Sequence, residues 1–289
     1  MLRSLLYSLR SEVNTRRLLS GLRRELATDT PLLLVHQMGR VGSMTLVNTL
    51  RAMQLPWPIY HTHYLNPDNL ARNIERRQKV QWFVWQRHLR VARLLSAAIT
   101  HRLDARQWYI VSTIREPVGR NLSNFILDIE RFHIPGFFRR YERGEIGVDQ
   151  ALEVFFRDFN HDAHTDWIRD ELNANFGLDV YREPFDPAQG YQILHRDNVH
   201  VLIFQLERFD EVFKAGLEAF FGRPAPARPV HTHISSDDAR AGTAYREMLS
   251  RIRLPQDYIE RLYDSEYMRH FYTPEQIRAF RDKWRRSGP

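Results

Sequence analysis

The sequence of 289 residues contains no cysteine. This absence excludes a disulfide framework, a thiolate metal site and a cysteine nucleophile. The sequence also lacks any run of about eighteen apolar residues, so it predicts no membrane-spanning helix. The lack of cysteine fits a reducing compartment, and we expect a cytoplasmic location, with peripheral contact at the inner face of the membrane as a second option.

The sequence has fewer acidic than basic residues, 35 aspartates and glutamates against 42 lysines and arginines, which gives a net charge of +7. This balance favours anionic partners, such as a phosphorylated cofactor, an acidic glycan, nucleic acid or anionic lipid, without selecting among them. The length is sufficient for a full hydrophobic core. We predict two parts, a basic amphipathic segment over residues 1–28 and a single α/β domain over residues 29–289.

The N-terminal segment has leucines near helical spacing with arginines between them. Two alternatives follow: a helix packed on the domain, or an amphipathic helix that binds a membrane surface or a partner. The arginines interrupt every apolar stretch, which argues against a signal peptide.

A strand, a glycine turn and a helix are predicted near the start of the domain. Residues 32–35 form a short apolar run typical of a buried parallel strand, and residues 43–50 have helical periodicity. Between them lie Gly39 and Gly42. This geometry directs backbone N–H groups and the positive end of the helix dipole at one point, which favours anion binding.

Three further side chains strengthen this anion site. Arg40 adds a positive charge, and Ser43 and Thr45 add hydroxyl donors. The spacing differs from the nucleotide-binding P-loop, because the two glycines are only three positions apart and Ser43 stands where that motif has lysine.

A second phosphate-binding pattern follows the predicted strand at residues 108–114. Arg115 stands at the exit of this strand, and Pro117 suits the first turn of a helix. Ser123 lies two helical turns beyond Arg115, so both side chains can converge on one phosphate.

The remaining elements predict an alternation of strands and helices. A second strand is expected at residues 55–60, a helix at residues 84–101 and another strand at residues 199–205, while residues 131–195 look irregular and residues 230–289 helical. This order implies a parallel sheet whose ligands bind at the carboxyl ends of the strands.

Together, the glycine turn and the Arg115…Ser123 pair resemble the two cofactor-binding motifs of the sulfotransferase superfamily, in its carbohydrate and bacterial branches. The stretches 166–167, 176–185 and 263–272 look similar to bacterial capsular-polysaccharide sulfotransferases. The resemblance implies a three-layer, P-loop-like α/β fold with a central parallel sheet flanked by helices. It also implies that 3′-phosphoadenosine 5′-phosphosulfate (PAPS) is the sulfuryl donor, bound by Gln37, Gly39, Arg40, Val41, Gly42, Ser43, Met44, Thr45, Arg115 and Ser123.

Transfer of SO₃ to an acceptor hydroxyl needs positive charge over the leaving oxygens and a base for the acceptor proton. Arg40 supplies the charge, and a histidine can supply the base because imidazole titrates near neutral pH. The sequence from Tyr60 to His63 resembles that of the hexuronyl 2-O-sulfotransferases. By this resemblance His63 is the base and His61 positions the acceptor, while Glu183 and Glu207 remain alternative bases.

Two other histidine patterns were considered. The second His-Thr-His, at 231–233, is either a wall of the site or a surface loop. His161 and His164 have metal-like spacing without accompanying carboxylates, so we predict no metal.

The predicted function is therefore transfer of a sulfuryl group from PAPS to a carbohydrate hydroxyl. The alternatives are a nucleotide-dependent phosphotransferase and, behind it, a nucleic-acid-binding protein. The predicted partners are PAPS and a carbohydrate acceptor, with no nucleic acid.

Overall fold

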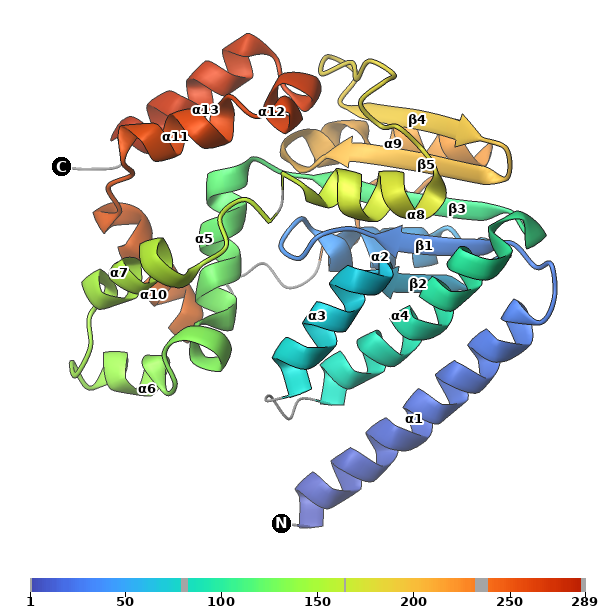
Figure 1. Ribbon diagram of the computed structural model, residues 1–289, viewed down its shortest axis with the longest axis horizontal. Helices are drawn as coiled ribbons and strands as arrows, with labels where there is room; N and C mark the ends of the chain where they lie inside the picture. Colours follow the sequence, from blue (N-terminus) through green and yellow to red (C-terminus); the bar gives the residue numbers. More distant parts are fainter. Residues whose placement is uncertain (1, 79–82, 164, 232–238, 287–289) are drawn as a thin grey trace.

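A computed structural model describes residues 2–78, 83–163, 165–231 and 239–286. Five strands form one sheet in the order β2-β1-β3-β5-β4, and helices cover both of its faces (Figure 1). The strands are β1 (Leu32–His36), β2 (Ile59–Thr62), β3 (Trp108–Ile114), β4 (Tyr191–Arg196) and β5 (Val199–Gln205). The expected α/β class with a central sheet flanked by helices is confirmed. The sheet is mostly parallel, because only the edge strand β4 runs antiparallel to its neighbour.

The sheet is buried on both faces. In β1, Leu33 and Val35 belong to one core cluster, together with residues of α2 (Ser43–Ala52) and α9 (Phe209–Phe221). Leu32 and Leu34 belong to the larger cluster on the opposite face. A strand buried on both sides needs a continuous apolar run, which is why β1 has no polar alternation.

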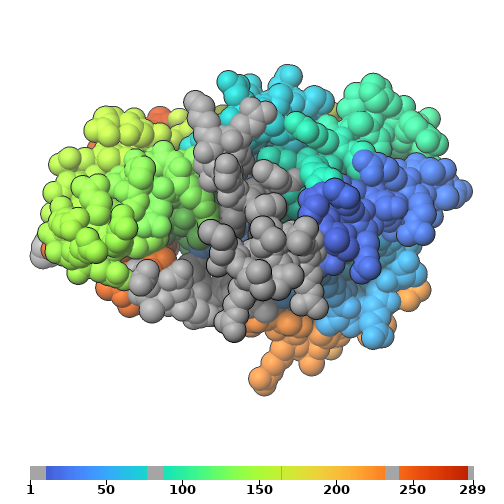
Figure 2. Space-filling view, turned by 90° about the horizontal axis from the view of Figure 1, so that it is seen from below, coloured from blue at the N-terminus to red at the C-terminus, as the bar shows by residue number. Residues whose placement is uncertain are grey.

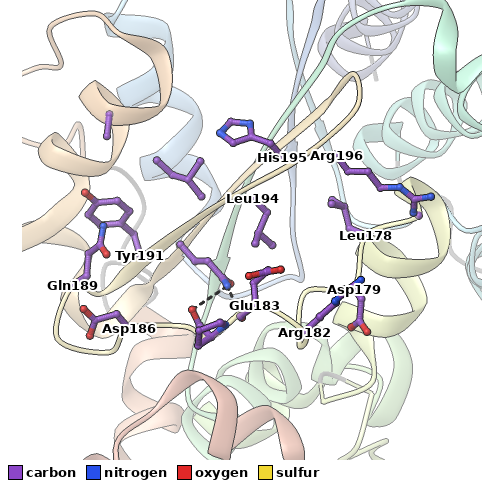
Figure 3. A pocket seen from close by; sticks show the side chains of 15 residues that line it. Leu178, Asp179, Arg182, Glu183, Asp186, Gln189, Tyr191, Leu194, His195 and Arg196 are labelled. Atoms are coloured by element: carbon purple, nitrogen blue, oxygen red, sulfur yellow. Dashed lines mark hydrogen bonds between the residues drawn. The ribbon is translucent and has the colours of Figure 1, made fainter.

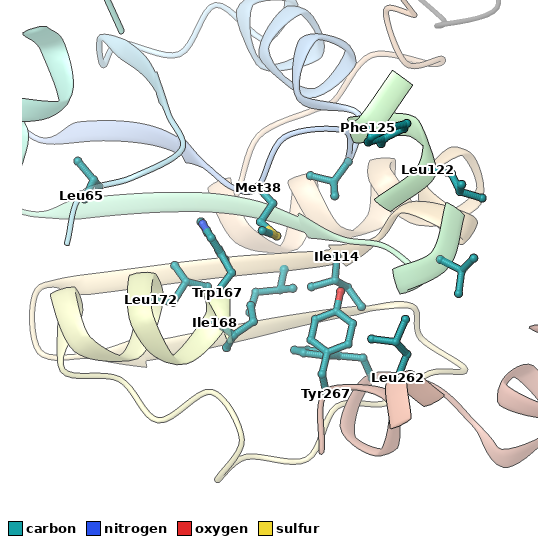
Figure 4. Close-up of a cluster of buried hydrophobic side chains, with 14 of the residues drawn as sticks. Met38, Leu65, Ile114, Leu122, Phe125, Trp167, Ile168, Leu172, Leu262 and Tyr267 are labelled. Carbon is teal, nitrogen blue, oxygen red and sulfur yellow. The ribbon is translucent and has the colours of Figure 1, made fainter. Parts of the chain in front are cut away.

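The larger cluster joins distant parts of the chain. It contains residues of α1 (Leu2–Leu26), α4 (Phe83–Arg102) and α5 (Pro117–Asp128). Figure 4 shows part of it, where Met38 from the glycine turn lies in the same group as Trp167 and Tyr267. Packing of this one core therefore connects the glycine turn to the C-terminal part of the chain.

The other helices lie around these layers. They are α3 (Pro67–Gln78), α6 (Phe137–Glu142), α7 (Val148–Asp158), α8 (Ala174–Phe176), α10 (Ala239–Arg251), α11 (Gln256–Tyr263), α12 (Glu266–Phe271) and α13 (Pro274–Arg286). Two π-helical segments, Ile129–His133 and Ile168–Asn173, and two 3₁₀ turns, Leu103–Ala105 and Leu206–Arg208, complete the set. In the face shown in Figure 2, α1 lies at one side and α6 and α7 at the other.

Two sequence-based expectations about these elements need correction. The second strand was expected at residues 55–60, but β2 begins at Ile59, since Pro56 and Pro58 cannot donate to a sheet ladder. The stretch 131–195 was expected to be irregular, yet it contains α6, α7, α8 and the edge strand β4.

The N-terminal helix α1 contacts the body of the protein at several positions, among them Glu12, whose carboxylate accepts from Arg90 of α4. Leu19 and Leu22 are buried in the larger core cluster, and the hydroxyl of Tyr60 donates to the carboxylate of Glu25. Arg106 donates to the carbonyl oxygen of Glu25 at 2.8 Å. The division of the chain after residue 28 and the contact of this segment with a membrane stay predictions. Across the described ranges, no helix combines the length and the apolar character that crossing a bilayer requires.

The glycine turn after β1 has two residues in the left-handed region, Arg40 with φ 72° and Gly42 with φ 81°. A Cβ atom added at Gly42 would lie 2.7 Å from Cδ1 of Leu206. The turn thus depends on glycine at position 42 for both its backbone conformation and its packing.

We expect Gly42→Ala to destabilise the fold by more than the roughly 1–2 kcal/mol of left-handed strain alone, because the added methyl group also meets Leu206. Gly144→Ala is the matched control, since Gly144 has φ 68° but no atom lies within 4 Å of the place that an added Cβ would occupy. Urea unfolding of both variants measures the difference. Equal losses would show that the contact with Leu206 is unimportant.

Candidate functional site

A cleft of about 540 Å³ opens where β1 and β3 end. In the sheet, β2 lies on one side of β1, while β3 and β5 follow on the other side, so the strand order reverses between β1 and β3. Ligands of open α/β sheets bind at such a switch point. Residues of helices α3 and α5, whose places in the fold Figure 1 shows, line the cleft. The cleft is lined by four of the residues predicted from the sequence, Gly39, Arg40, Ser43 and His63.

The two predicted anion-binding motifs meet at this cleft. Nε of Arg40 donates to Oγ of Ser123 at 3.0 Å, although the two residues are 83 positions apart. Nη1 of Arg115 donates to the carbonyl oxygen of Arg40 at 3.0 Å. The motifs therefore form one site, in which the second motif supports the backbone of the first.

A third arginine joins them. Arg120, on α5, is buried, and its Nε donates to the carbonyl oxygen of Gly39 at 3.2 Å. Sequence reasoning missed Arg120, although its i, i+3 spacing to Ser123 places both residues on the same helix face.

The three guanidinium groups concentrate positive charge at the turn. In the part of the chain that the structure describes, no carboxylate lies within ion-pair distance of Arg40, Arg115 or Arg120. Burial, and then the charge of Arg115, lowers the pKa of Arg40, and burial lowers the pKa of Arg120 to about 10. An anion bound here would relieve this repulsion.

The other residues predicted around the glycine turn differ in their exposure and in the cavity that they line. The side chains of Gln37 and Val41 are buried, so only their backbone can face a ligand, whereas Met44 is exposed. Gly42 and Thr45 line a second, smaller cavity of about 240 Å³. The turn therefore separates two cavities.

The smaller cavity also contains one residue of the second His-Thr-His. Nε2 of His231 lies 3.3 Å from Oδ2 of Asp210. The other two residues of that motif, 232 and 233, lie outside the described residues.

The two predicted catalytic histidines are adjacent, with ring centroids 4.6 Å apart. Nδ1 of His63 lies 2.6 Å from the carbonyl oxygen of Gln37. A carbonyl can only accept, so Nδ1 carries the hydrogen and the lone pair of the neutral ring is on Nε2. This tautomer has the proton-accepting atom that a general base needs.

His61 differs from His63. It lies within β2 rather than beyond it, and within the described chain its Nε2 is buried without a hydrogen-bond partner. Burial, and then the neighbouring His63 and His88, lowers the pKa of His61 well below its ordinary value. His88 of α4, whose ring centroid is 5.3 Å from that of His61, was missed because nothing in the sequence pairs α4 with β2.

Both π-helical segments contribute to the cleft. Phe132 and His133 come from the first, and Asp170 comes from the second. Trp167, just before the second segment, donates from its indole nitrogen to the carbonyl oxygen of His63 at 3.0 Å. Such segments occur frequently at functional sites, and here the first supplies two ring side chains and the second follows directly after Trp167.

The C-terminal helices hold the strand end that carries Arg115. The hydroxyl of Tyr267 accepts from the N–H of Arg115 at 3.1 Å and donates to its carbonyl oxygen at 3.0 Å. Tyr263 donates to the carboxylate of Glu116 at 2.7 Å, and the N–H of Glu116 donates to Glu207 at 2.8 Å. Glu207, an alternative base in the sequence analysis, therefore holds the backbone of this turn.

Glu183, the other alternative base, lies elsewhere. It lines a cavity of about 1110 Å³ beside the edge strand β4, together with Arg182, Gln192 and Arg196 (Figure 3). Arg40 and His63 do not line this cavity. The structure thus separates Glu183 from the charged turn.

Of the two histidines with metal-like spacing, His164 lies outside the described residues, and His161 has protein partners. Nδ1 of His161 lies 2.9 Å from the hydroxyl of Tyr258, and its Nε2 lies 2.9 Å from the carbonyl oxygen of Phe155. Among the described residues, no group of three or more histidines and carboxylates could hold a metal ion.

We expect Tyr267→Phe to lower the free energy of unfolding by about 1–3 kcal/mol, because the backbone N–H and carbonyl of Arg115 lose their buried partner. Tyr191→Phe is the control, since no hydrogen bond of the Tyr191 hydroxyl is present in the described structure. Chemical denaturation provides the measurement. Similar stability of the two variants would argue against the role assigned to Tyr267.

Comparison with known proteins gives one match. Residues 146–273 match the model of a family described as "Putative capsular polysaccharide synthesis protein". No curated protein and no solved structure matches the chain. The matched segment includes Trp167 from the cleft and Tyr267 from the support of Arg115, but it excludes the glycine turn. The match supports a role related to capsular polysaccharide synthesis.

Proposed function

We propose that the chain is a PAPS-dependent sulfotransferase with a P-loop-like fold, which transfers a sulfuryl group to a hydroxyl of a carbohydrate. The observation that carries the proposal is the group of three guanidinium side chains at the glycine turn, with no carboxylate partner in the described structure. A donor with a phosphosulfate and a further phosphate would supply the missing negative charge.

The residues at the turn fit such a donor. Arg40 and the backbone of residues 41–45 would hold the phosphosulfate, and Arg115 with Ser123 would hold the second phosphate. When bound, PAPS supplies an activated sulfuryl group. The guanidinium group of Arg40 stabilises negative charge on the leaving oxygen. Because a guanidinium is a very weak acid, Arg40 keeps its own proton during the transfer.

The cleft on the other side of the turn fits the acceptor. His63 lines it, and Nε2 of the neutral ring accepts the proton of the acceptor hydroxyl. His61, kept uncharged by its low pKa, orients His63 through the contact of their rings. Arg40 lines this cleft and also bonds to Ser123 of the proposed donor site, so the two proposed sites meet at Arg40.

Carbohydrate is the proposed acceptor for two reasons. The cleft combines aromatic side chains, including Phe132, Phe159 and Trp167, with amides and charged groups that can bond hydroxyls. The match to a capsular polysaccharide synthesis family agrees with this combination.

The donor is tested by thermal shift. We expect adenosine 3′,5′-bisphosphate to raise the melting temperature without Mg²⁺, by the equivalent of about 2.7 kcal/mol at 100 times its dissociation constant. Arg115→Ala should weaken this binding by about 1.5–3 kcal/mol, because a charge-assisted bond is lost. Arg278→Ala is the control, since Arg278 is exposed and contacts Glu275.

Two outcomes would contradict this assignment. Stabilisation by ATP with Mg²⁺ but not by the bisphosphate would favour the phosphotransferase. Stabilisation by single-stranded DNA alone would favour a nucleic-acid-binding protein.

The base is tested by turnover with an active glycan acceptor. We expect His63→Ala to lower kcat by about 10²–10⁴-fold with nearly unchanged bisphosphate affinity, because the general base is lost. His61→Ala should have a smaller effect, and Glu183→Gln should have none, because Glu183 lies in the other cavity. Wild-type turnover in His63→Ala would remove His63 from the mechanism.

A further inference from the structure

Helix α3 presents one polar face to the cleft. Asn69, Arg72, Asn73 and Arg76 all line the cavity, and their spacing of i, i+3, i+4 and i+7 places them on the same side of the helix. Two amides and two guanidinium groups therefore form one continuous wall of the cleft.

The two arginines of this wall have no negative partner. Nη2 of Arg72 donates to Oδ1 of Asn69 at 2.6 Å, and the guanidinium carbon of Arg76 lies 4.8 Å from the ring centroid of Phe132. In the described ranges, no carboxylate is within ion-pair distance of either arginine. Each guanidinium is held in place by a neutral group, which leaves its charge uncompensated.

The acidic groups of the cleft do not remove this charge. Asp128 forms an ion pair with Arg131 at 3.3 Å. Asp166 and Asp170 belong to the segment around Trp167, and burial, with the charge of Asp170, raises the pKa of Asp166. The acidic and basic groups thus come from different walls, so a ligand would meet positive charge along α3.

We propose that the α3 wall recognises anionic groups on the acceptor, so that the acceptor is an acidic glycan rather than a neutral one. As a statement about the acceptor, this inference rests on the proposed function. Arg40, Arg115 and Arg120 are occupied by the donor in that function, whereas Arg72 and Arg76 lie on another element and remain for the acceptor. The guanidinium fork matches carboxylate and sulfate oxygens. The amide nitrogen of Asn73 donates to the carbonyl oxygen of Asn69, and its amide oxygen can accept from a sugar hydroxyl.

The two arginines of the wall can contact two anionic groups of one acceptor. Arg76 lies four positions after Arg72, a rise of about 6 Å along the helix. Two sources can supply the anions: carboxylates of uronic acids in the polymer, or sulfates added in earlier rounds of transfer. Both carry the same charge and acceptor oxygens, and the experiment below distinguishes them.

The test uses the full chain and three oligosaccharides of equal length. One is neutral, one contains uronates, and one is a chemically sulfated derivative of the neutral chain. Isothermal titration calorimetry should show at least tenfold tighter binding of one or both anionic chains than of the neutral chain, decreasing with salt. The double variant Arg72→Gln/Arg76→Gln should lose this preference, and Arg72→Lys/Arg76→Lys should keep most of it. The control Arg17→Gln/Arg24→Gln removes two exposed charges of α1, outside the cleft, and should bind as the wild type.

Preference for the uronate chain would identify the polymer as the source of the charges, and preference for the sulfated chain would identify earlier products. Equal binding of neutral and anionic chains, or wild-type binding by Arg72→Gln/Arg76→Gln, would overturn the inference. The same proteins are titrated with adenosine 3′,5′-bisphosphate. Bisphosphate binding without glycan preference refutes only the acidic acceptor, whereas glycan preference without bisphosphate binding refutes only the sulfotransferase.

Discussion

The repulsion between three guanidinium groups at one turn is the constraint on which the site depends. Arg40, Arg115 and Arg120 are held by carbonyl oxygens and by the hydroxyl of Ser123 instead of by carboxylates. Neutral partners fix the positions of the three guanidinium groups but do not neutralise their charge. The folded protein therefore keeps a positive electrostatic potential where β1 and β3 end. Much of the surrounding structure serves to hold this arrangement: the left-handed Arg40, the buried α5 and the support of Arg115 by Tyr267.

The C-terminal helices act on this site from a distance along the chain. Tyr263 and Tyr267 bond to Glu116 and Arg115, and Glu116 in turn accepts from the N–H groups of Val118 and Gly119 at the start of α5. The carboxylate of Glu116 therefore caps the helix that carries Arg120 and Ser123. The segment matched by the family model thus contributes support for the charged turn and a wall of the cleft, while the turn itself comes from the preceding part of the chain.

Local patterns account for what the sequence predicted well. The strands at 108–114 and 199–205 are short runs rich in β-branched and other apolar residues, and the parallel order of the sheet is enough to bring the ends of β1 and β3 together. The edge strand β4 and the π-helical segments have no comparable signal, because pairing with β5 and packing around Trp167 decide them. In the candidate site, the motifs and the strand order account for the nearness of Arg40, Arg115 and Ser123, while their role stays a prediction. The places of His88 and Glu183 depend on tertiary contacts that no local pattern encodes.

The hydrogen bonds that build the site join residues very far apart in sequence, and this has a consequence for folding. Arg40 bonds to Ser123 across 83 positions, and Arg115 bonds to Tyr267 across 152. Closing such large loops costs chain entropy before any contact compensates for it, so contacts of this range form late and slow the folding reaction. A nascent chain would therefore bury most of its core before the charged turn acquires its final shape. The charged turn can reach this arrangement only after the chain as far as Tyr267 has been synthesised.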